Sequence, residues 1–544
     1  MVVLMLNFKL QFVNVFMKIL FVDPQGKHVP IEGKPGVALN LGLATLSSVL
    51  IKKGHTVSLF DMANHFENNL SSLRAILKEH KPDIVGFSVI NSQYTNAMST
   101  IKDIRTYTDA LILAGGAEAT AMKEKIIEES GDAIDILMLG EAEETLVEVI
   151  NCLENNDVKN ISNVKGVIIN TCAKILSSVK HPNLLEIENG TSKYIVTGEA
   201  GKVKDINSLP DPNMDIFGVS KMSEYKIMAS RGCPFKCNFC FMYLGRGHRR
   251  RDPDRIVAQL IHEKHKYDYD KFRFFDPIFN LKMSWVHDVC DAIQNSELNG
   301  TAWEAVGLRA DQLDDDLARH MAEAGCRRVD IGVETLDQEV FDLIDKGETL
   351  EELITGIQIA LQHFEVVSLY IIIGLPKDTM KKCLYTYNEV KKLGKAIGVK
   401  NEPIVNYSLA VPYTATRLKD WVNDNAKIIQ DSHDTYTRGS EAMNHGTAYE
   451  TDDFSSAERL KVYKILQTKE FRYMSSSKIS RYITPLLWVR DAITCDMMNI
   501  HKHMFFIFNR IIKEIVGRKT SGTYMREYVE YSRIPNGTWW LGGE

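Results

Sequence analysis

The sequence predicts an α/β protein made of two consecutive parallel-sheet domains and a mainly helical C-terminal region. Over residues 17–155, short apolar runs alternate with amphipathic helical patterns, which is typical of a doubly wound sheet covered by helices on both faces. Over residues 226–420, a second series of six strand–helix units predicts a partial parallel β/α barrel. Over residues 421–544 the alternation is lost. The less regular residues 156–225 are expected to link the two domains.

The composition is that of an ordinary globular protein. The chain has 544 residues, of which 44% are hydrophobic and 25% are charged, and its net charge is −6. Such a length predicts roughly two to four domains. The slightly acidic balance argues against a nucleic-acid partner.

No uninterrupted apolar stretch reaches the ~18–20 residues of a membrane-spanning helix, so membrane association is not expected, although it is not excluded. Residues 1–16 are apolar but short, and they lack the charged start and small-residue cleavage site of a signal peptide. We expect an N-terminal arm or an upstream start-site artefact there. Six scattered cysteines are expected to be small buried side chains, whereas three clustered ones indicate a metal and a reducing, cytoplasmic environment.

The first series contains five strand patterns. The expected strands are Lys18–Asp23, Thr56–Asp61, Asp83–Val89, Leu111–Ala114 and Ile134–Leu139. The expected helices are Leu39–Lys53, Leu70–His80, Ala97–Tyr107 and Glu143–Leu153. A further short strand, Gly166–Asn170, falls in the linking segment.

Small and polar residues follow these strands, at the edge of the sheet where such folds bind their ligands. They are Ser88, Asn91, Gly115, Gly116, Thr120, Gly140, Glu141 and Glu143. Glycine lets a bulky ligand approach the backbone closely, but the same residues are also typical of ordinary turns. No GxGxxG motif follows the first strand, so a dinucleotide is not favoured.

The second series supplies the expected barrel. Its strands are Tyr225–Ala229, Lys271–Phe275, Ala302–Gly307, Arg328–Val333, Val367–Ile373 and Val405–Ala410. Its helices are Pro253–Lys266, Ser284–Asn295, Asp314–Ala324, Asp337–Leu343, Leu350–His363 and Met380–Lys395. Beyond it, Phe454–Arg472 and Ile483–Arg518 have helical patterns. We expect the latter to cap the barrel or line a substrate pocket rather than lie on a membrane surface.

Three cysteines, Cys233, Cys237 and Cys240, form a CxxxCxxC motif directly after the first barrel strand. Thiolates are the usual ligands of iron–sulfur clusters. Three of them can hold three irons of a cubane, which leaves the fourth iron open to another ligand. Structural zinc is the alternative, but it needs four ligands, and neither His248 nor Cys290 completes a second pair.

This motif, with Phe239 before its last cysteine, resembles the signature of the radical S-adenosylmethionine (SAM) superfamily. The resemblance implies a TIM-like barrel in which a 4Fe–4S cluster on the three cysteines binds SAM and cleaves it to a 5′-deoxyadenosyl radical. Further segments stand in family order: Phe274–Phe279, Gly307–Arg309, Gly332–Thr335, Ile373–Asp378 and, only in part, Pro412–Thr416. By resemblance, SAM contacts come from Phe239, Asp276, Arg309, Glu334, Thr335 and Ile373. Thr335 and Asp378 depart mildly from the family's more usual serine and glutamate.

The N-terminal domain then resembles the Rossmann-like cobalamin-binding domain that precedes many radical SAM barrels, so that the two resemblances cover about residues 17–420. The implied cobalamin contacts are Gly42, Ser88, Asn91, Gly115, Gly116, Thr120, Gly140, Glu141 and Glu143. Gln25 stands where relatives that ligate cobalt from below carry histidine, and His28 is out of register. No imidazole ligand to cobalt is therefore expected. A methylthiotransferase is disfavoured because no cysteine precedes Cys152.

These resemblances imply a cobalamin-dependent radical SAM methyltransferase that acts on an unactivated carbon of a small molecule or natural-product precursor. Its expected partners are that substrate and an external electron donor such as flavodoxin or ferredoxin. Two alternatives stay open. One is a cobalamin-containing radical enzyme that cyclises, rearranges or oxidises without methyl transfer. The other is a redox or vitamin sensor without enzymatic activity.

Overall fold

The structure is a computed structural model that describes residues 16–24, 39–62, 68–155, 157–171, 186–189, 192–199, 201–399, 401–430, 433 and 447–474. Three sequence-based expectations fall outside these ranges. They concern the N-terminal arm except Phe16, the replacement of a cobalt-ligating histidine by Gln25, and the helical pattern Ile483–Arg518.

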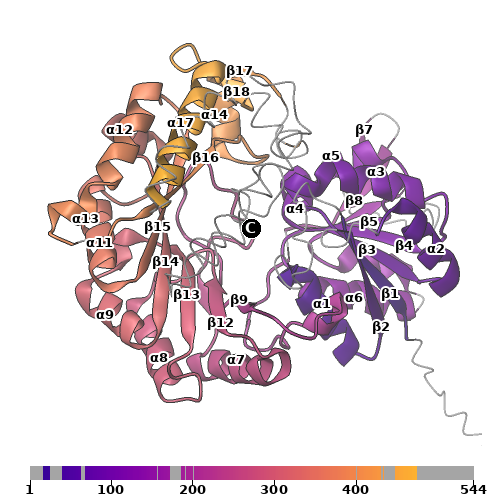
Figure 1. The fold of residues 1–544 in the computed structure, drawn as a ribbon. Helices are drawn as coiled ribbons and strands as arrows, with labels where there is room; N and C mark the ends of the chain where they lie inside the picture. Colours follow the sequence, from indigo (N-terminus) through magenta and orange to yellow (C-terminus); the bar gives the residue numbers. More distant parts are fainter. Residues whose placement is uncertain are drawn as a thin grey trace, which may run out of the picture.

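The N-terminal domain is built on a sheet whose described strands run in the order β2-β1-β3-β4-β5-β6-β8-β7 (Figure 1). The parallel strands are β1 (Lys18–Asp23), β2 (Thr56–Asp61), β3 (Ile84–Ser88), β4 (Leu111–Gly115) and β5 (Ile136–Met138). The antiparallel strands are β6 (Val167–Asn170), β7 (Glu186–Asn189) and β8 (Ser192–Val196). Strand order reverses at β1, because β2 and β3 pair with its opposite edges, and this places a ligand crevice at the C-terminal ends of β1 and β3.

Helices cover both faces of this sheet. They are α1 (Leu41–Lys52), α2 (Leu70–His80), α3 (Tyr94–Ile104), α4 (Ala117–Met122), α5 (Glu124–Ser130) and α6 (Glu143–Glu154). The side chain of Asn40 accepts a hydrogen bond from the Leu43 amide, and this N-cap explains why α1 begins where it does. Two buried apolar clusters, one on each face, hold the helices on the sheet.

The second domain is an open six-stranded parallel sheet in the order β16-β15-β14-β13-β12-β9. Its strands are β9 (Glu224–Ile227), β12 (Lys271–Phe275), β13 (Ala302–Leu308), β14 (Cys326–Glu334), β15 (Val366–Ile373) and β16 (Ile404–Leu409). Within the described residues, β9 and β16 are its two edges, so the barrel is partial. The predicted α/β fold class is therefore confirmed.

Helices alternate with these strands around the outside of the barrel. They are α7 (Pro253–Tyr267), α8 (Met283–Gln294), α9 (Asp315–Glu323), α10 (Gln338–Ile344), α11 (Leu350–His363), α12 (Met380–Val390) and α13 (Leu393–Ala396). One large apolar cluster fills the space between them and the sheet, with Trp303, Phe272 and Phe274 fully buried at its centre.

The described part of the C-terminal region contains α14 (Arg417–Asn425), the short strands β17 (Lys427–Ile428) and β18 (Tyr449–Glu450), and α17 (Ser456–Met474). Helix α17 packs against β16, where the rings of Tyr463 and Tyr407 meet edge to face with their centroids 5.0 Å apart. Figure 1 shows α17 beside α12 and β16 at the far end of the barrel from β9.

The segment expected to link the domains contains more regular structure than its sequence suggested. Strands β6 and β8 extend the N-terminal sheet beyond β5, and β7 forms its edge. The connection continues through residues 201–217, where Asn213 donates a backbone hydrogen bond to the Ala44 carbonyl of α1 (3.0 Å). This segment therefore packs against the first domain before it enters the second.

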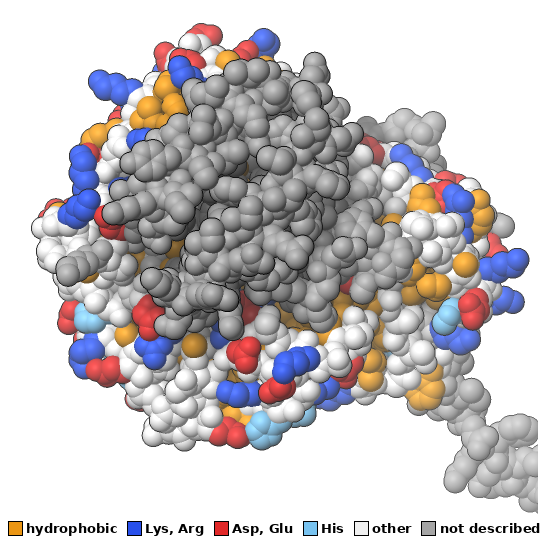
Figure 2. Space-filling model, in the orientation of Figure 1, with side chains coloured by type: hydrophobic (Ala, Val, Ile, Leu, Met, Phe, Trp, Pro, Cys, Tyr) orange, Lys and Arg blue, Asp and Glu red, His pale blue; other side chains and the backbone are white. Residues whose placement is uncertain are grey.

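No helix among the described residues is both long and apolar enough to cross a membrane. On the face of the molecule in Figure 2, Lys and Arg side chains are interspersed with Asp and Glu over the outer helices.

Candidate functional site

The cysteine loop leaves the barrel at the C-terminal end of β9. Two very short strands, β10 (Ser230–Arg231) and β11 (Arg249–Arg250), pair with each other and tie its two ends together. Gly232 has a φ of +84°, and a Cβ at that position would collide with the Gly247 carbonyl oxygen. The loop therefore folds back on itself in a way that requires glycine immediately before Cys233.

All three cysteines are free and half-buried. Burial raises the pKa of Cys237 to about 12 and that of Cys240 to about 11, and the negative charges around them act in the same direction. These thiols therefore stay protonated at neutral pH unless a cation displaces the proton. Iron–sulfur clusters bind thiolates and supply that positive charge, so the donor set fits such a group.

A single-ion site is not formed here. No group of three or more His, Cys, Asp or Glu side chains in the described chain is arranged to hold one metal ion. The His248 ring lies 3.1 Å from the Ile278 carbonyl oxygen, where it donates a hydrogen bond. The three thiols instead come from one loop, between Gly232 and His248.

Asp276 follows β12 and contacts the residues just before the cysteine loop. Its carboxylate accepts hydrogen bonds from the Ser230 hydroxyl (2.6 Å) and from the backbone amides of Ser230 and Ala229. Burial raises its pKa to about 7, although these hydrogen bonds oppose the shift. Asp276 thus joins the second barrel strand to the strand that carries the cluster motif.

Arg309, which follows β13, supports the cysteine loop rather than pointing into open space. Its guanidinium stacks on the Phe235 ring, with Cζ 3.5 Å from the ring centroid. It also donates hydrogen bonds to the carbonyl oxygens of Lys346 (2.7 Å) and Gly347 (3.1 Å). Phe235 lies between Cys233 and Cys237, so this contact fixes the first half of the loop.

The end of β14 carries buried charges. Glu334 has a left-handed backbone with a φ of +63°, and burial raises the pKa of its carboxyl to about 7 despite the nearby Lys346. Lys346 forms an ion pair with Glu348 (2.8 Å). The left-handed backbone of Glu334 is strained, and such strain in a non-glycine residue is typical of functional sites. Next to it, the buried Thr335 hydroxyl lies 3.3 Å from that of Thr386.

Ile373 ends β15 and is fully buried. The peptide group of the next residue, Gly374, is held from both sides. Its N–H donates to Asp378 (2.8 Å), and its carbonyl accepts from Arg459 (3.1 Å) and from the Tyr449 hydroxyl. The C-terminal region thus reaches back to this strand end. Phe239 is half-buried and packs against the barrel core.

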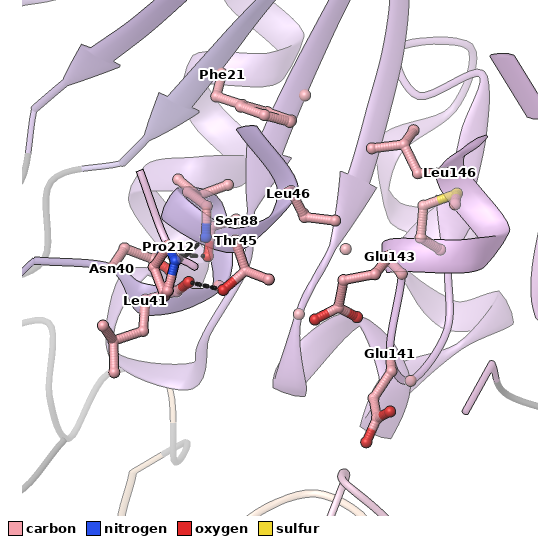
Figure 3. Close-up of a pocket in the computed structure, with 18 of the residues that line it drawn as sticks. Phe21, Asn40, Leu41, Thr45, Leu46, Ser88, Glu141, Glu143, Leu146 and Pro212 are labelled. Atoms are coloured by element: carbon pink, nitrogen blue, oxygen red, sulfur yellow. Dashed lines mark hydrogen bonds between the residues drawn. The ribbon is translucent and has the colours of Figure 1, made fainter. Parts of the chain in front are cut away.

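A cavity of about 240 Å³ opens at the C-terminal edge of the N-terminal sheet (Figure 3). Phe21, Leu46 and Leu146 form its apolar end, and Glu141 and Glu143 lie at the opposite end. The sequence-predicted residues that line it are Gly42, Ser88, Gly115, Gly116, Gly140, Glu141 and Glu143. The barrel domain contributes Met228, Arg231, Tyr243, Leu244, Arg251 and Gln259. The cavity therefore lies between the two domains.

Glycine is required along one wall of this cavity. Gly116 has a φ of +114°, and a Cβ there would lie 2.7 Å from the Val89 carbonyl oxygen. Thr120 does not line the cavity but fastens its rim, because its hydroxyl donates to Gly116 O (2.9 Å) and accepts from Gly140 N (2.8 Å). The Ser88 hydroxyl is fixed in the same way, because it accepts a hydrogen bond from the side-chain amide of Asn40 (3.1 Å).

Asn91 lies after β3 and outside the cavity lining. It is buried, and neither atom of its side-chain amide has a hydrogen-bond partner among the described residues. Buried amides are rarely left unpaired, so this one is available to a ligand. Within the cavity itself, an apolar end and a glycine wall fit a ligand with a large apolar part, as cobalamin has.

Glu141 and Glu143 contact the other domain. Arg231 forms an ion pair with Glu143 (2.7 Å), and Arg249 donates to Glu141 (2.8 Å). The two arginines that flank the cysteine loop thus meet the loop after β5. Sequence reasoning did not identify Phe235, Lys346, Glu348 or Arg459 as parts of the site. Phe235 occupies a variable position of the cysteine motif, and the other three stand in no motif with recognisable spacing.

Two families match the chain, one in each domain. Residues 34–150 match the B12 binding domain, and residues 227–390 match the Radical SAM superfamily. The first match covers most of the cavity wall, and the second begins just before the cysteine loop and ends at the last residue of α12.

Curated relatives are distant. An uncharacterized methyltransferase of Pyrococcus horikoshii is 25% identical over 92% of this chain and 98% of its own length. An anaerobic magnesium-protoporphyrin IX monomethyl ester cyclase of Cereibacter sphaeroides is 23% identical over 76% of this chain and 65% of its own length. A bacteriochlorophyllide d C-12(1)-methyltransferase of Chlorobaculum tepidum is 21% identical over 53% of this chain and 63% of its own length.

Two solved proteins share the fold. The cobalamin-dependent SAM radical enzyme OxsB, with aqua-cobalamin and SAM bound, superposes with a TM-score of 0.63 at 18% identity, over 96% of this chain and 84% of its own. The radical SAM methyltransferase TsrM of Kitasatospora setae, with cobalamin and a [4Fe-4S] cluster bound, superposes with a TM-score of 0.58 at 17% identity, over 75% of each chain.

Proposed function

This chain is a cobalamin-dependent radical SAM enzyme, and from that premise we propose that it transfers a methyl group to an unactivated carbon of a small-molecule substrate. Its cofactors are a 4Fe–4S cluster, SAM and cobalamin. When bound, the cluster supplies the electron that cleaves SAM, and cobalamin supplies a carrier for the methyl group. The remaining roles belong to the chain's own residues.

The observation that carries this proposal is the position of the cavity between the domains. Arg231 lines it, and only Gly232 separates Arg231 from Cys233. A ligand in the cavity would therefore lie close to the loop that we propose as the cluster site. Methyl transfer to a substrate radical requires the methyl carrier and the radical source to face one reaction space.

The residues after the barrel strands have the chemistry to hold SAM. We propose that the Asp276 carboxylate accepts hydrogen bonds from the methionine ammonium group, because charge-assisted hydrogen bonds of this kind are strong. Glu334 and Thr335 are proposed to face the ribose and the carboxylate, and the backbone at Ile373 the adenine. Asn91 and the glycines around the cavity are proposed as cobalamin contacts.

The names of the relatives support methyl transfer and also one alternative. The relative that spans nearly the whole chain is named a methyltransferase, although an uncharacterized one. Another is named a cyclase, and it matches about three quarters of this chain. Ring formation without methyl transfer is therefore the second candidate. Either reaction requires a one-electron donor, for which we propose a flavodoxin or ferredoxin.

The two reactions differ in their products from SAM. We would incubate the reconstituted enzyme anaerobically with SAM, a chemical reductant and the small-molecule fraction of an extract from host cells. Methyl transfer consumes two molecules of SAM per turnover, so S-adenosylhomocysteine and 5′-deoxyadenosine should form in about equal amounts. 5′-Deoxyadenosine without S-adenosylhomocysteine would contradict methyl transfer and support the second candidate.

A matched pair of cysteine variants controls this assay. Cys237→Ala removes a proposed cluster ligand and should abolish 5′-deoxyadenosine formation. Cys290→Ala removes a buried thiol on α8 of the same domain and should leave the product ratio unchanged. If Cys237→Ala still forms 5′-deoxyadenosine, the proposed cluster site is wrong.

A further inference from the structure

Two half-buried arginines and two buried glutamates join the domains of this enzyme. The Arg249 guanidinium pairs with both oxygens of Glu141, and Arg231 pairs with Glu143 at 2.7 Å and with Glu141 at 3.5 Å. The exposed fractions of the four side chains are 15% and 14% for the arginines and 2% and 7% for the glutamates. We call this four-residue cluster the ion-pair bridge.

On the barrel side, the ion-pair bridge begins at the two ends of the cysteine loop. Arg231 and Arg249 stand directly opposite each other in the β10–β11 ladder. Like charges at such positions repel, so the ladder needs nearby carboxylates. Arg231 is followed by Gly232 and Cys233, and Arg249 also donates to the Leu244 carbonyl within the loop (3.0 Å). A movement of either arginine would move the cysteines.

On the other side, the ion-pair bridge ends in the loop after β5. Glu141 and Glu143 both line the cavity wall, and Glu143 is the first residue of α6. Glu141 also accepts a hydrogen bond from the Val203 amide (2.7 Å), and the Val203 carbonyl accepts one from Arg249. The connecting segment is therefore part of the same network, and it holds the two carboxylates in place.

We propose that the ion-pair bridge is a positioning device, which sets the distance and orientation between the cobalamin site and the iron–sulfur site. Breaking a buried ion pair leaves an uncompensated charge, so the four side chains resist separation. None of them needs to contact a reacting atom for this role. The proposal rests on the presence of the two cofactors in this enzyme and not on methyl transfer.

Charge exchange across the bridge tests the proposal. Glu141→Arg and Arg249→Glu each place like charges together, whereas the double variant E141R/R249E restores opposite charges with exchanged places. A displacement of about 1 Å can lower a reaction rate about 100-fold, and we expect the rate of methyl transfer to fall by about that factor in each single variant. The double variant should react about tenfold faster than either single variant, as expected for a directly interacting pair.

The decisive readout is spectroscopic and needs no substrate. In the reconstituted enzyme, the dipolar splitting between the unpaired electrons of cob(II)alamin and the reduced cluster depends steeply on their separation. The single variants should change this splitting while they retain wild-type iron and cobalamin contents, and the double variant should return it toward the wild-type value. Failure to methylate any substrate would leave this result intact.

Two further variants complete the test. Glu144→Arg reverses a charge beside the bridge on the exposed face of α6 and should change neither the splitting nor the activity. Glu141→Gln keeps an oxygen for Val203 and covers the case in which a charge reversal prevents folding. An unchanged splitting in Glu141→Gln and in the single variants would overturn the proposal. Loss of cobalamin or iron from folded single variants would also overturn it, because the residues would then be cofactor ligands.

Discussion

The Asp276 carboxyl has a pKa near neutrality, and this predicts a pH dependence. Its pKa is raised to about 7 by burial, so the group is neutral below that pH and charged above it. If it accepts hydrogen bonds from the ammonium group of SAM, the rate of SAM cleavage per unit of bound SAM should rise as the pH passes upward through about 7. Asp276→Asn should lower the rate about 10–100-fold, the cost of one charge-assisted hydrogen bond, and flatten the profile.

The pH profile of 5′-deoxyadenosine formation checks this prediction. Asp311 serves as the control, because its carboxylate pairs with Arg309 and its pKa is lowered by hydrogen bonds to that guanidinium and to Gln312 despite burial. Asp311→Asn should therefore keep the wild-type profile near pH 7. A wild-type profile that is flat between pH 6 and 8 would show that Asp276 does not control the step.

The backbone conformation of Gly116 leads to a second prediction. Gly116→Ala should destabilise the N-terminal domain by about 1–3 kcal/mol, because a left-handed backbone and a contact with the Val89 carbonyl both oppose a Cβ. Gly131→Ala is the matched control: its φ is +66°, but no atom lies within 4 Å of the new Cβ. Denaturant unfolding of both variants compares the two costs, and equal losses would contradict a role for the Val89 contact.

Motif spacing pointed to those candidate site residues that belong to short contiguous segments. Cys233, Cys237 and Cys240 lie in one loop, and the polar residues after β3, β4 and β5 gather at one edge of the sheet. The sequence could not predict Phe235 beneath Arg309 or Lys346 beside Glu334. These contacts join distant segments through side chains that are common elsewhere in proteins. Glu141 and Glu143 were expected to bind cobalamin, but nothing in their local sequence indicated their arginine partners.

Among the elements, α17 contacts the barrel through a buried arginine. Arg459 is 1% exposed, lies over the Tyr449 ring at 4.3 Å and donates to the Gly374 carbonyl. Arg459→Met should remove this support and lower SAM affinity about tenfold or more, because one buried charged hydrogen bond contributes about 1.5–3 kcal/mol. Titration calorimetry with SAM measures the effect.

Lys461→Met on the exposed face of α17 is the control for this variant. It makes the same change of residue type without touching Gly374, so its SAM affinity should equal that of the wild type. If Arg459→Met binds SAM as the wild type does while the protein stays folded, α17 supports the barrel without affecting the SAM site.

Periodicity predicted the regular elements well and the short ones poorly. Strands β1, β2 and β12 have the expected bounds, and so do α2 and α11. Helices α4 and α5 were missed because Gly115-Gly116 resembled a simple turn and each helix is only one to two turns long. Strands β7 and β8 were missed because a hairpin at the edge of a sheet leaves little apolar periodicity in its sequence.

At the scale of the whole molecule, the cavity between the domains predicts that cobalamin stabilises both of them. Ligand at about 100 times its dissociation constant should add about 2.7 kcal/mol to the free energy of unfolding. Hydrogen exchange should slow in residues 140–143 of the first domain and also in residues 243–251 of the second. Protection confined to the first domain would contradict a shared cavity.

Further contacts join the domains around the cavity. Ser48 of α1 donates to the Asp211 carbonyl (2.6 Å), and the Asp211 carboxylate pairs with Arg255 of α7 (2.5 Å). On another side, His433 pairs with Glu118 (2.8 Å) and stacks on Tyr94. Contacts on several sides of the interface favour a fixed arrangement of the domains over a hinged one.

The pairing of β10 with β11 also bears on how the protein acquires its iron. Because the ladder ties both ends of residues 232–248, the entropy of closing this loop is lost when the chain folds and not when the metal arrives. The apoprotein should then keep its thiols close to their final places. Assembly of the cluster would be a local event on a preorganised scaffold, without refolding of the barrel.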